Sequence, residues 1–237
     1  MINAEWEVMG KRKGEKMYEY VTKAEYQPVR KEIEAIIQKV RNYMWTHYKV
    51  KFQDQLIGSG KRHLITRTVK GNGGYDFDYN LIISSSIQGK SNTPKKLKQQ
   101  FMEAFSVALK GTKYSAPQDS TSAITIKVID KKHSKVLHSC DFAIIYYKND
   151  LKTNGYYYLK NNKSQKQYIF EYRELSKNID LKLQKILCVS NGWTLIRDEY
   201  IKLKNNNKDI NKHSFSLYLE AIHNVYNRLP RKGEKTL

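Results

Sequence analysis

The sequence predicts an α+β fold in which a mixed sheet is flanked by helices and followed by a helical C-terminal part. Three observations lead to this prediction. Near the N-terminus, apolar residues recur at steps of three and four, which is the spacing of one buried helix face. In the middle of the chain, short segments are apolar or alternate with polar residues, as strands do. Helical spacing then returns in the last third of the chain.

The first half of the chain is expected to hold two helices and two strands. The apolar stripe over residues 26–48 predicts a long helix, and residues 52–57 predict a short strand that ends at Gly58-Ser59-Gly60. After a basic segment and a glycine-rich loop, residues 75–83 predict a second strand. Thr93 can cap and Pro94 can open the next helix, and Gly111 is placed to end it.

The second half is expected to hold paired strands and then helices. Residues 123–129 and 136–147 are predicted to be two paired strands, and residues 156–159 and 167–170 a further hairpin. Three helices are expected to follow, centred near Leu183, Ile196 and Ala221. The Lys/Asn-rich run 202–212 is interpreted as a solvated loop between two of them.

Composition limits the function classes. The chain has 237 residues, and 43 Lys+Arg against 23 Asp+Glu give a net charge of +20, which favours a polyanionic partner. The alternative interpretation is that the positive charge serves only the solubility of a Lys/Asn-rich chain. No apolar run approaches the roughly 20 residues that span a bilayer, and the N-terminus lacks a signal-peptide pattern. Two cysteines, Cys140 and Cys188, argue against a disulfide scaffold or a cysteine zinc site. We therefore expect a cytoplasmic protein without a membrane partner.

Three aspartates are candidates for a metal site. Asp76 and Asp78 lie two residues apart on a predicted strand, so their side chains share one face and repel each other unless a cation or solvent relieves them. Mg²⁺ (or Mn²⁺) is suited to such hard oxygen ligands. Asp141 interrupts an apolar strand, where an unpaired acid is costly. The alternatives are solvated acids for the first pair and one buried salt bridge for Asp141.

Gly58 and Ser59 are candidates for binding a phosphate. They follow a predicted strand, and backbone N–H groups at such a turn, together with the Ser59 hydroxyl, can hold an anion. The basic run Lys61, Arg62 and His63 directly after them favours this interpretation. The alternative is an ordinary turn between a strand and a helix.

The order of these motifs resembles the DNA-polymerase-β-like nucleotidyltransferase superfamily. The resemblance rests on Gly58-Ser59, Asp76-x-Asp78 and Asp141, with a long helix before them and helices after residue 170. It covers about residues 25–150. The initial helix and the hairpin before the third acid are most similar to the branch of oligoadenylate synthetase, cyclic GMP-AMP synthase and the bacterial cyclic-oligonucleotide synthases. The resemblance implies a nucleotidyltransferase core, which we place over 19–170. The helical spacing after it predicts a helical C-terminal lobe over 171–237, and the polar, charged residues before it predict a flexible basic arm over 1–18.

The resemblance also implies residue roles. Asp76 and Asp78 would bind two Mg²⁺ ions, and Asp141 would bind the ion that activates an attacking hydroxyl. Gly58, Ser59 and Lys61 would bind the nucleotide, and Lys182 or Lys185 of the C-terminal helices would reach its phosphates. The implied activity is transfer of a nucleotidyl group from an NTP to a hydroxyl of a nucleotide or RNA, with release of pyrophosphate.

Two other functions stay open. Many members of the superfamily have a second Gly-Ser or Gly-Thr pair soon after the first, and residues 61–64 provide none. Together with the charge of +20, this leaves a catalytically inactive nucleic-acid-binding protein on the same scaffold. A plain interaction protein, such as one half of a toxin–antitoxin-like pair, is the third possibility. The sequence does not indicate the oligomeric state.

Overall fold

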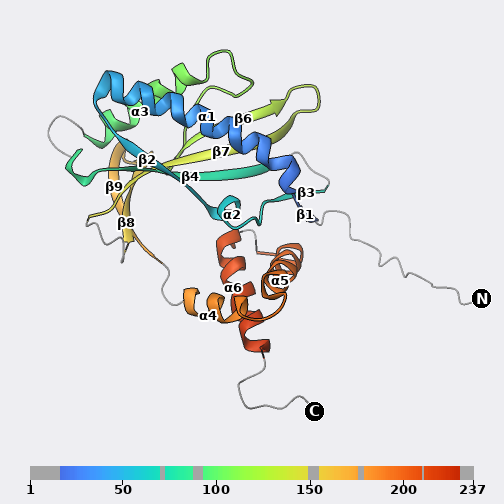
Figure 1. The fold of residues 1–237 in the computed structure, drawn as a ribbon. Helices are drawn as coiled ribbons and strands as arrows, with labels where there is room; N and C mark the ends of the chain where they lie inside the picture. Colours follow the sequence, from blue (N-terminus) through green and yellow to red (C-terminus); the bar gives the residue numbers. More distant parts are fainter. Residues whose placement is uncertain are drawn as a thin grey trace, which may run out of the picture.

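The computed structural model describes residues 17–69, 73–87, 93–148, 155–175, 179–209 and 211–229. A seven-stranded mixed sheet forms its centre (Figure 1). The central strand β7 (Lys135–Tyr146) pairs in parallel with β4 (Tyr75–Ile83) and antiparallel with β6 (Ile124–Asp130). The sheet is completed by β2 (Phe52–Ile57), β5 (Gln118–Asp119), β8 (Gly155–Asn162) and β9 (Gln167–Glu174). The predicted α+β fold with a mixed sheet is confirmed.

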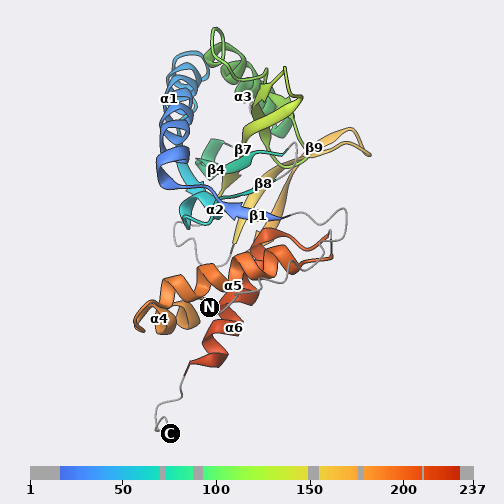
Figure 2. The ribbon, with the colours of Figure 1, turned by 90° about the vertical axis from the view of Figure 1, so that its right-hand side faces the viewer.

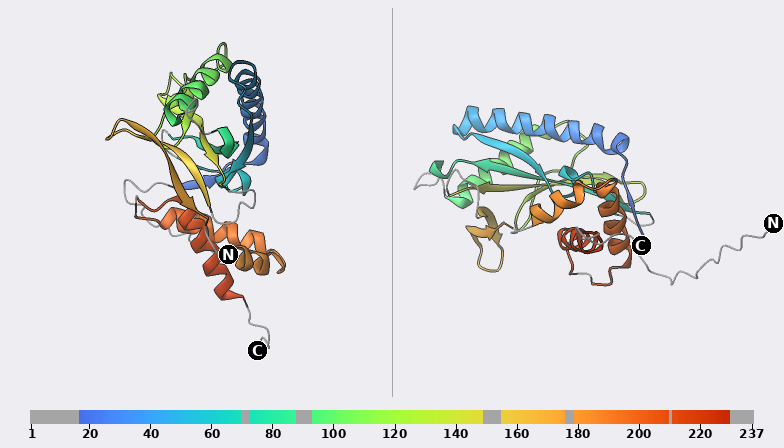
Figure 3. Two further views of the ribbon diagram at one scale, coloured as in Figure 1. Left: turned by 90° about the vertical axis from the view of Figure 1, so that its left-hand side faces the viewer. Right: turned by 60° about the horizontal axis from the view of Figure 1, so that its bottom comes forward.

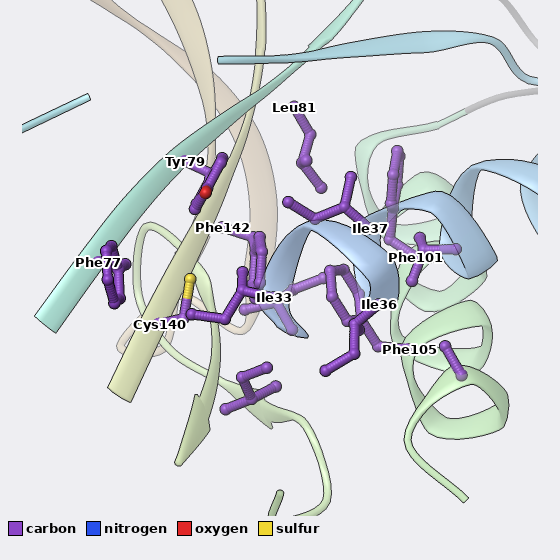
Figure 4. Close-up of a cluster of buried hydrophobic side chains, with 14 of the residues drawn as sticks. Ile33, Ile36, Ile37, Phe77, Tyr79, Leu81, Phe101, Phe105, Cys140 and Phe142 are labelled. Atoms are coloured by element: carbon purple, nitrogen blue, oxygen red, sulfur yellow. The ribbon is translucent and has the colours of Figure 1, made fainter. Parts of the chain in front are cut away.

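Two helices cover one face of the sheet (Figures 1 and 2). They are α1 (Lys23–Tyr48) and α3 (Pro94–Ala108). A capping box between Thr22 and Glu25 starts α1, and the Thr93 hydroxyl caps α3. The core beneath them is drawn in Figure 4 and includes Ile33, Ile36, Ile37, Phe77, Tyr79, Leu81, Phe101, Phe105, Cys140 and Phe142.

Burial of this core decides where the aspartates point. The odd-numbered residues from Tyr75 to Ile83 in β4 and the even-numbered residues from His138 to Ile144 in β7 are buried under the helices. Side chains alternate between the faces of a strand. The residues between them, including Asp76, Asp78 and Asp141, therefore face the opposite side of the sheet.

The C-terminal lobe lies on the side of the acids and has its own core (Figures 2 and 3). It consists of α4 (Ile179–Leu187), α5 (Gly192–Asn206) and α6 (Ser214–Arg228). Its core includes Ile186, Ile196, Tyr200 and Ile222, and Leu64 from the segment after β2 packs into it. No helix among the described residues has the length and apolar content needed to cross a bilayer.

The structure corrects two local expectations. β1 (Tyr18–Tyr20) pairs with β3 (Thr66–Thr68), so Tyr18 is not part of an arm; residues 1–16 of the expected arm lie outside the described residues. The run 202–212 is not all loop, because α5 continues to Asn206. Tertiary contacts explain both differences: Tyr18 and Thr66 each bond to a side chain of α5.

Candidate active site

The three aspartates meet on one face of the sheet. In the parallel pairing of β4 with β7, Asp78 lies opposite Asp141 and Asp76 lies opposite Ser139. The antiparallel partner of Asp141 on β6 is Thr125. The site is therefore built on three adjacent strands at the centre of the sheet, on the face that the helices α1 and α3 leave uncovered.

The carboxylates are close enough to influence one another. Burial, followed by the negative charges of Asp141 and Asp76, raises the pKa of Asp78 to about 6. Burial also raises the pKa of Asp141, although the hydrogen bond from the Thr125 hydroxyl works in the other direction. The Asp76 carboxylate accepts a hydrogen bond from the Ser139 hydroxyl. The site thus concentrates negative charge in a partly desolvated place.

Gly58 brings the end of β2 against Asp78. It has a left-handed backbone, with a φ of 62°, and a Cβ at this position would overlap the Asp78 carboxylate. The short helix α2 (Gly58–Lys61) begins here, and Ser59 is its half-buried second residue. The turn therefore requires glycine on two grounds, and it places Gly58 and Ser59 beside the acids.

Two basic side chains, Arg62 and Lys204, interact electrostatically with the acids. The Arg62 guanidinium donates to the Gly58 carbonyl oxygen over 2.9 Å and opposes the rise in the pKa of Asp78. It rests on α6, with its Cζ 4.6 Å from the centre of the Tyr218 ring. Lys204 of α5 donates to the Thr66 hydroxyl over 2.6 Å. Burial lowers the pKa of Lys204 to about 8, and the charge of Asp76 opposes that change.

Lys182 and Lys185, two of the three lysines predicted to bind nucleotide, lie away from the acids, and Lys61 belongs to the same short helix as Ser59. Lys61 is exposed at the end of α2. The Lys182 ammonium lies 2.9 Å from His223 Nδ1, and the Lys185 ammonium lies 3.3 Å from the Tyr226 hydroxyl. His223 and Tyr226 come more than two helical turns after Phe215, which lies beside Arg62. The structure brings Gly58, Ser59 and the three aspartates together, and it does not bring Lys182 or Lys185 to them.

The three carboxylates are suitable ligands for divalent cations once the side chains of two of them rotate. Carboxylate oxygens that repel one another are the ligands that Mg²⁺ and Mn²⁺ prefer. In the part of the chain that the structure describes, no three His, Cys, Asp or Glu side chains already surround a single point. Asp76 and Asp141 instead accept hydrogen bonds from the Ser139 and Thr125 hydroxyls. Rotation of these two side chains would exchange a hydroxyl for a cation.

Sequence reasoning missed Lys204 as a site residue. It noted Arg62 in the basic run after Ser59 but chose only Lys61 from that run as a site residue. Lys204 lies in the Lys/Asn-rich run interpreted as loop, where one lysine has no feature that separates it from its neighbours. Arg62 is the third residue after Ser59, and only the packing against α6 distinguishes it from Lys61. Ser139 and Thr125 could have been found from the strand pattern, because each shares the face of Asp141.

The chain has the fold of the nucleotidyltransferases that form the bacterial cyclic-oligonucleotide synthase branch, as the motif order on the sequence implied. No protein-family model and no curated protein matches the sequence. Among solved structures it is similar to the di-nucleotide cyclase DncV of Vibrio cholerae in complex with ATP and GTP, at a TM-score of 0.64 and 9% identity, over 90% of this chain and 71% of that one.

Two further structures share the fold. CdnC of Escherichia coli MS115-1 with ATP has a TM-score of 0.50 and 14% identity, over 89% of this chain and 63% of that one. The CD-NTase CdnG of Bradyrhizobium diazoefficiens with GTP has a TM-score of 0.55 and 13% identity, over 91% of this chain and 68% of that one. The present chain therefore spans just under two thirds of CdnC. At these identities the similarity establishes the fold.

Proposed function

We propose that this protein is a divalent-metal-dependent nucleotidyltransferase. It would transfer a nucleotidyl group from an NTP to a hydroxyl of a nucleotide or RNA and release pyrophosphate. The observation that carries the proposal is the strand register, which sets Asp78 opposite Asp141 with Asp76 on the same face. The similar structures of DncV, CdnC and CdnG with ATP or GTP support a nucleotide as substrate.

The residues of the chain have distinct tasks in this proposal. Asp76 and Asp78 would hold two Mg²⁺ or Mn²⁺ ions, and Asp141 would share the ion beside the attacking hydroxyl. Bound there, such a pair lowers the pKa of the hydroxyl and neutralises the charge that develops on the leaving pyrophosphate. The Gly58-Ser59 turn would bind the triphosphate through backbone N–H groups and the Ser59 hydroxyl. Arg62 and Lys204 would supply positive charge to the same phosphates, in the place assigned by sequence to Lys182 or Lys185.

Turnover of NTPs tests the proposal directly. The purified chain is incubated with each labelled NTP, with Mg²⁺ or Mn²⁺ and with or without RNA, and pyrophosphate release and labelled products are measured. We expect Asp78→Asn and Asp141→Asn to reduce the rate by about a hundred-fold or more, because the charge that stabilises the transition state is lost. The matched control is Asp198→Asn, an exposed aspartate of α5.

Two results would contradict the proposal. One is the absence of pyrophosphate release from every NTP with either cation. The other is an unchanged rate in both aspartate variants while circular dichroism shows that they are folded.

A non-catalytic nucleic-acid-binding protein is the second candidate. It is favoured by the charge of +20 and by the hydrogen bonds that already occupy Asp76 and Asp141. RNA binding that is retained in the aspartate variants, in a protein without NTP turnover, would support this candidate over the first.

A further inference from the structure

A cavity of about 770 Å³ lies at the end of the sheet away from the aspartates. Its lining comes mainly from the last turns of α1, the start of β2 and the end of β4. These three segments lie at the left of Figure 1. Ile82, which lines it, follows Asp78 by four residues on β4, so the two positions are roughly 13 Å apart along the strand. The cavity is therefore separate from the candidate active site, although both use the same strand.

The cavity offers a flat aromatic surface to a ligand. Trp45 lines it and keeps 45% of its surface exposed, so its ring is open to a ligand. The Lys51 and Lys49 ammonium groups lie 4.5 and 5.4 Å from the centre of the Trp45 ring. Cation–π contacts of this kind at an exposed site are weak, so a ring can displace a lysine that then pairs with an anion. Aromatic side chains of this kind stack nucleobases.

The polar residues of the cavity complement a base edge and a phosphate. Asn42 and Gln53 contribute amides: the Asn42 oxygen accepts a hydrogen bond from the Gln38 amide over 2.9 Å, which leaves its nitrogen to donate to the edge of a base, and Gln53 can donate to that edge and accept from it. Arg41 and Lys51 contribute positive charge, and none of the described residues that line the cavity carries a carboxylate. Asp54, the ion-pair partner of Arg41, is outside the lining. A ligand without charge would not pair with Lys51, and inorganic phosphate would not stack on the Trp45 ring. A nucleotide can do both.

We propose that this cavity is a second, non-catalytic nucleotide-binding site, with the base on Trp45, the base edge at Asn42 and Gln53, and the phosphate at Lys51. The volume matches that of a pocket for a small ligand. The proposal stands independently of NTP turnover, because none of its residues belongs to the candidate active site.

Calorimetric titration with AMP, GMP, CMP and UMP in EDTA tests the site, since EDTA removes the divalent ions that the aspartate site would use. We expect saturable binding of at least one of them, with its nucleoside and inorganic phosphate binding at least about ten-fold more weakly. Trp45→Ala and Lys51→Gln should weaken binding by about five-fold or more. Trp45→Phe, which keeps a ring, and Lys39→Gln, an equal charge change on the exposed side of α1, should change it by less than about two-fold.

Three results would overturn the proposal. The first is that none of the four nucleotides binds. The second is that Lys51→Gln and Trp45→Ala leave the affinity unchanged. The third is that Arg62→Gln abolishes binding while Lys51→Gln does not, which would place the nucleotide beside the aspartates.

Discussion

At the scale of single residues, the fold places the Asp78 carboxylate where its ionised form is unfavourable. Asp78 lies in register with Asp141 and two residues from Asp76, and burial, followed by these two charges, raises its pKa from 3.8 to about 6. A raised pKa means that the ionised form is less favourable in the folded than in the unfolded chain. The metal-free protein is therefore destabilised by Asp78 above pH 6, and this penalty disappears as the pH falls below 4.

We predict that Asp78→Asn stabilises the metal-free protein. In EDTA at pH 7.5 its free energy of unfolding should exceed that of the wild type by about 1–3 kcal/mol, and the difference should vanish near pH 4, where the carboxyl of the wild type is protonated. Urea unfolding at both pH values measures this. Asp198→Asn is the control, and a destabilised Asp78→Asn at pH 7.5 would show that the repulsion is already relieved.

At the scale of elements, the short strand β1 joins the sheet region to the C-terminal lobe. Its backbone exchanges two hydrogen bonds with the Asn205 side chain of α5, from Tyr18 N over 2.6 Å and to Tyr18 O over 3.3 Å. The Tyr20 hydroxyl adds a bond of 2.7 Å to the Arg197 carbonyl oxygen. β1 pairs with β3, which carries Thr66, the hydrogen-bond partner of Lys204. The strand therefore connects the two sides of the candidate active site.

We expect Asn205→Ala to weaken this connection. Loss of two hydrogen bonds to a part-buried backbone should lower the free energy of unfolding by about 1–2 kcal/mol. Asn206→Ala, the exposed next residue of α5, is the matched control and should have almost no effect. Denaturant unfolding followed by fluorescence provides the measurement, and equal stability of the two variants would contradict the role given to Asn205.

For the whole molecule, charge is the dominant property. A surplus of +20 surrounds a site that is itself negative, so polyanions are attracted to the protein while the aspartates repel them locally. This combination suits a site that accepts phosphates only together with cations.

We predict that binding of single-stranded RNA depends steeply on salt. Between 50 and 200 mM NaCl the affinity should fall by about ten-fold or more, because each phosphate contact releases counter-ions. Fluorescence anisotropy of a labelled oligonucleotide measures this, and glycerol at equal osmolality serves as a non-ionic control. An affinity that does not change with salt would show that the charge has no part in RNA binding.

The regular elements could be predicted because local patterns determine them. The alternation of residues 75–83 and the helical stripe of residues 26–48 each reflect one buried face, and both elements were found within a few residues of their bounds. β1 and β3 could not be predicted, because they have three residues each and are stabilised by pairing with each other and by contacts with α5. Likewise, no local pattern shows that α5 extends through part of the Lys/Asn-rich run.

The sequence by itself determined the fold class, the pair Asp76 and Asp78 as neighbours on one strand face, and Asp141 as an acid in an apolar strand. Only the tertiary structure decided that these three meet, because the register between β4 and β7 depends on how both strands pack under α1 and α3. It also decided that Arg62 and Lys204, rather than Lys182 and Lys185, face the acids. A lysine in a lysine-rich helix has no local signature; its place follows from the packing of the C-terminal lobe against the sheet.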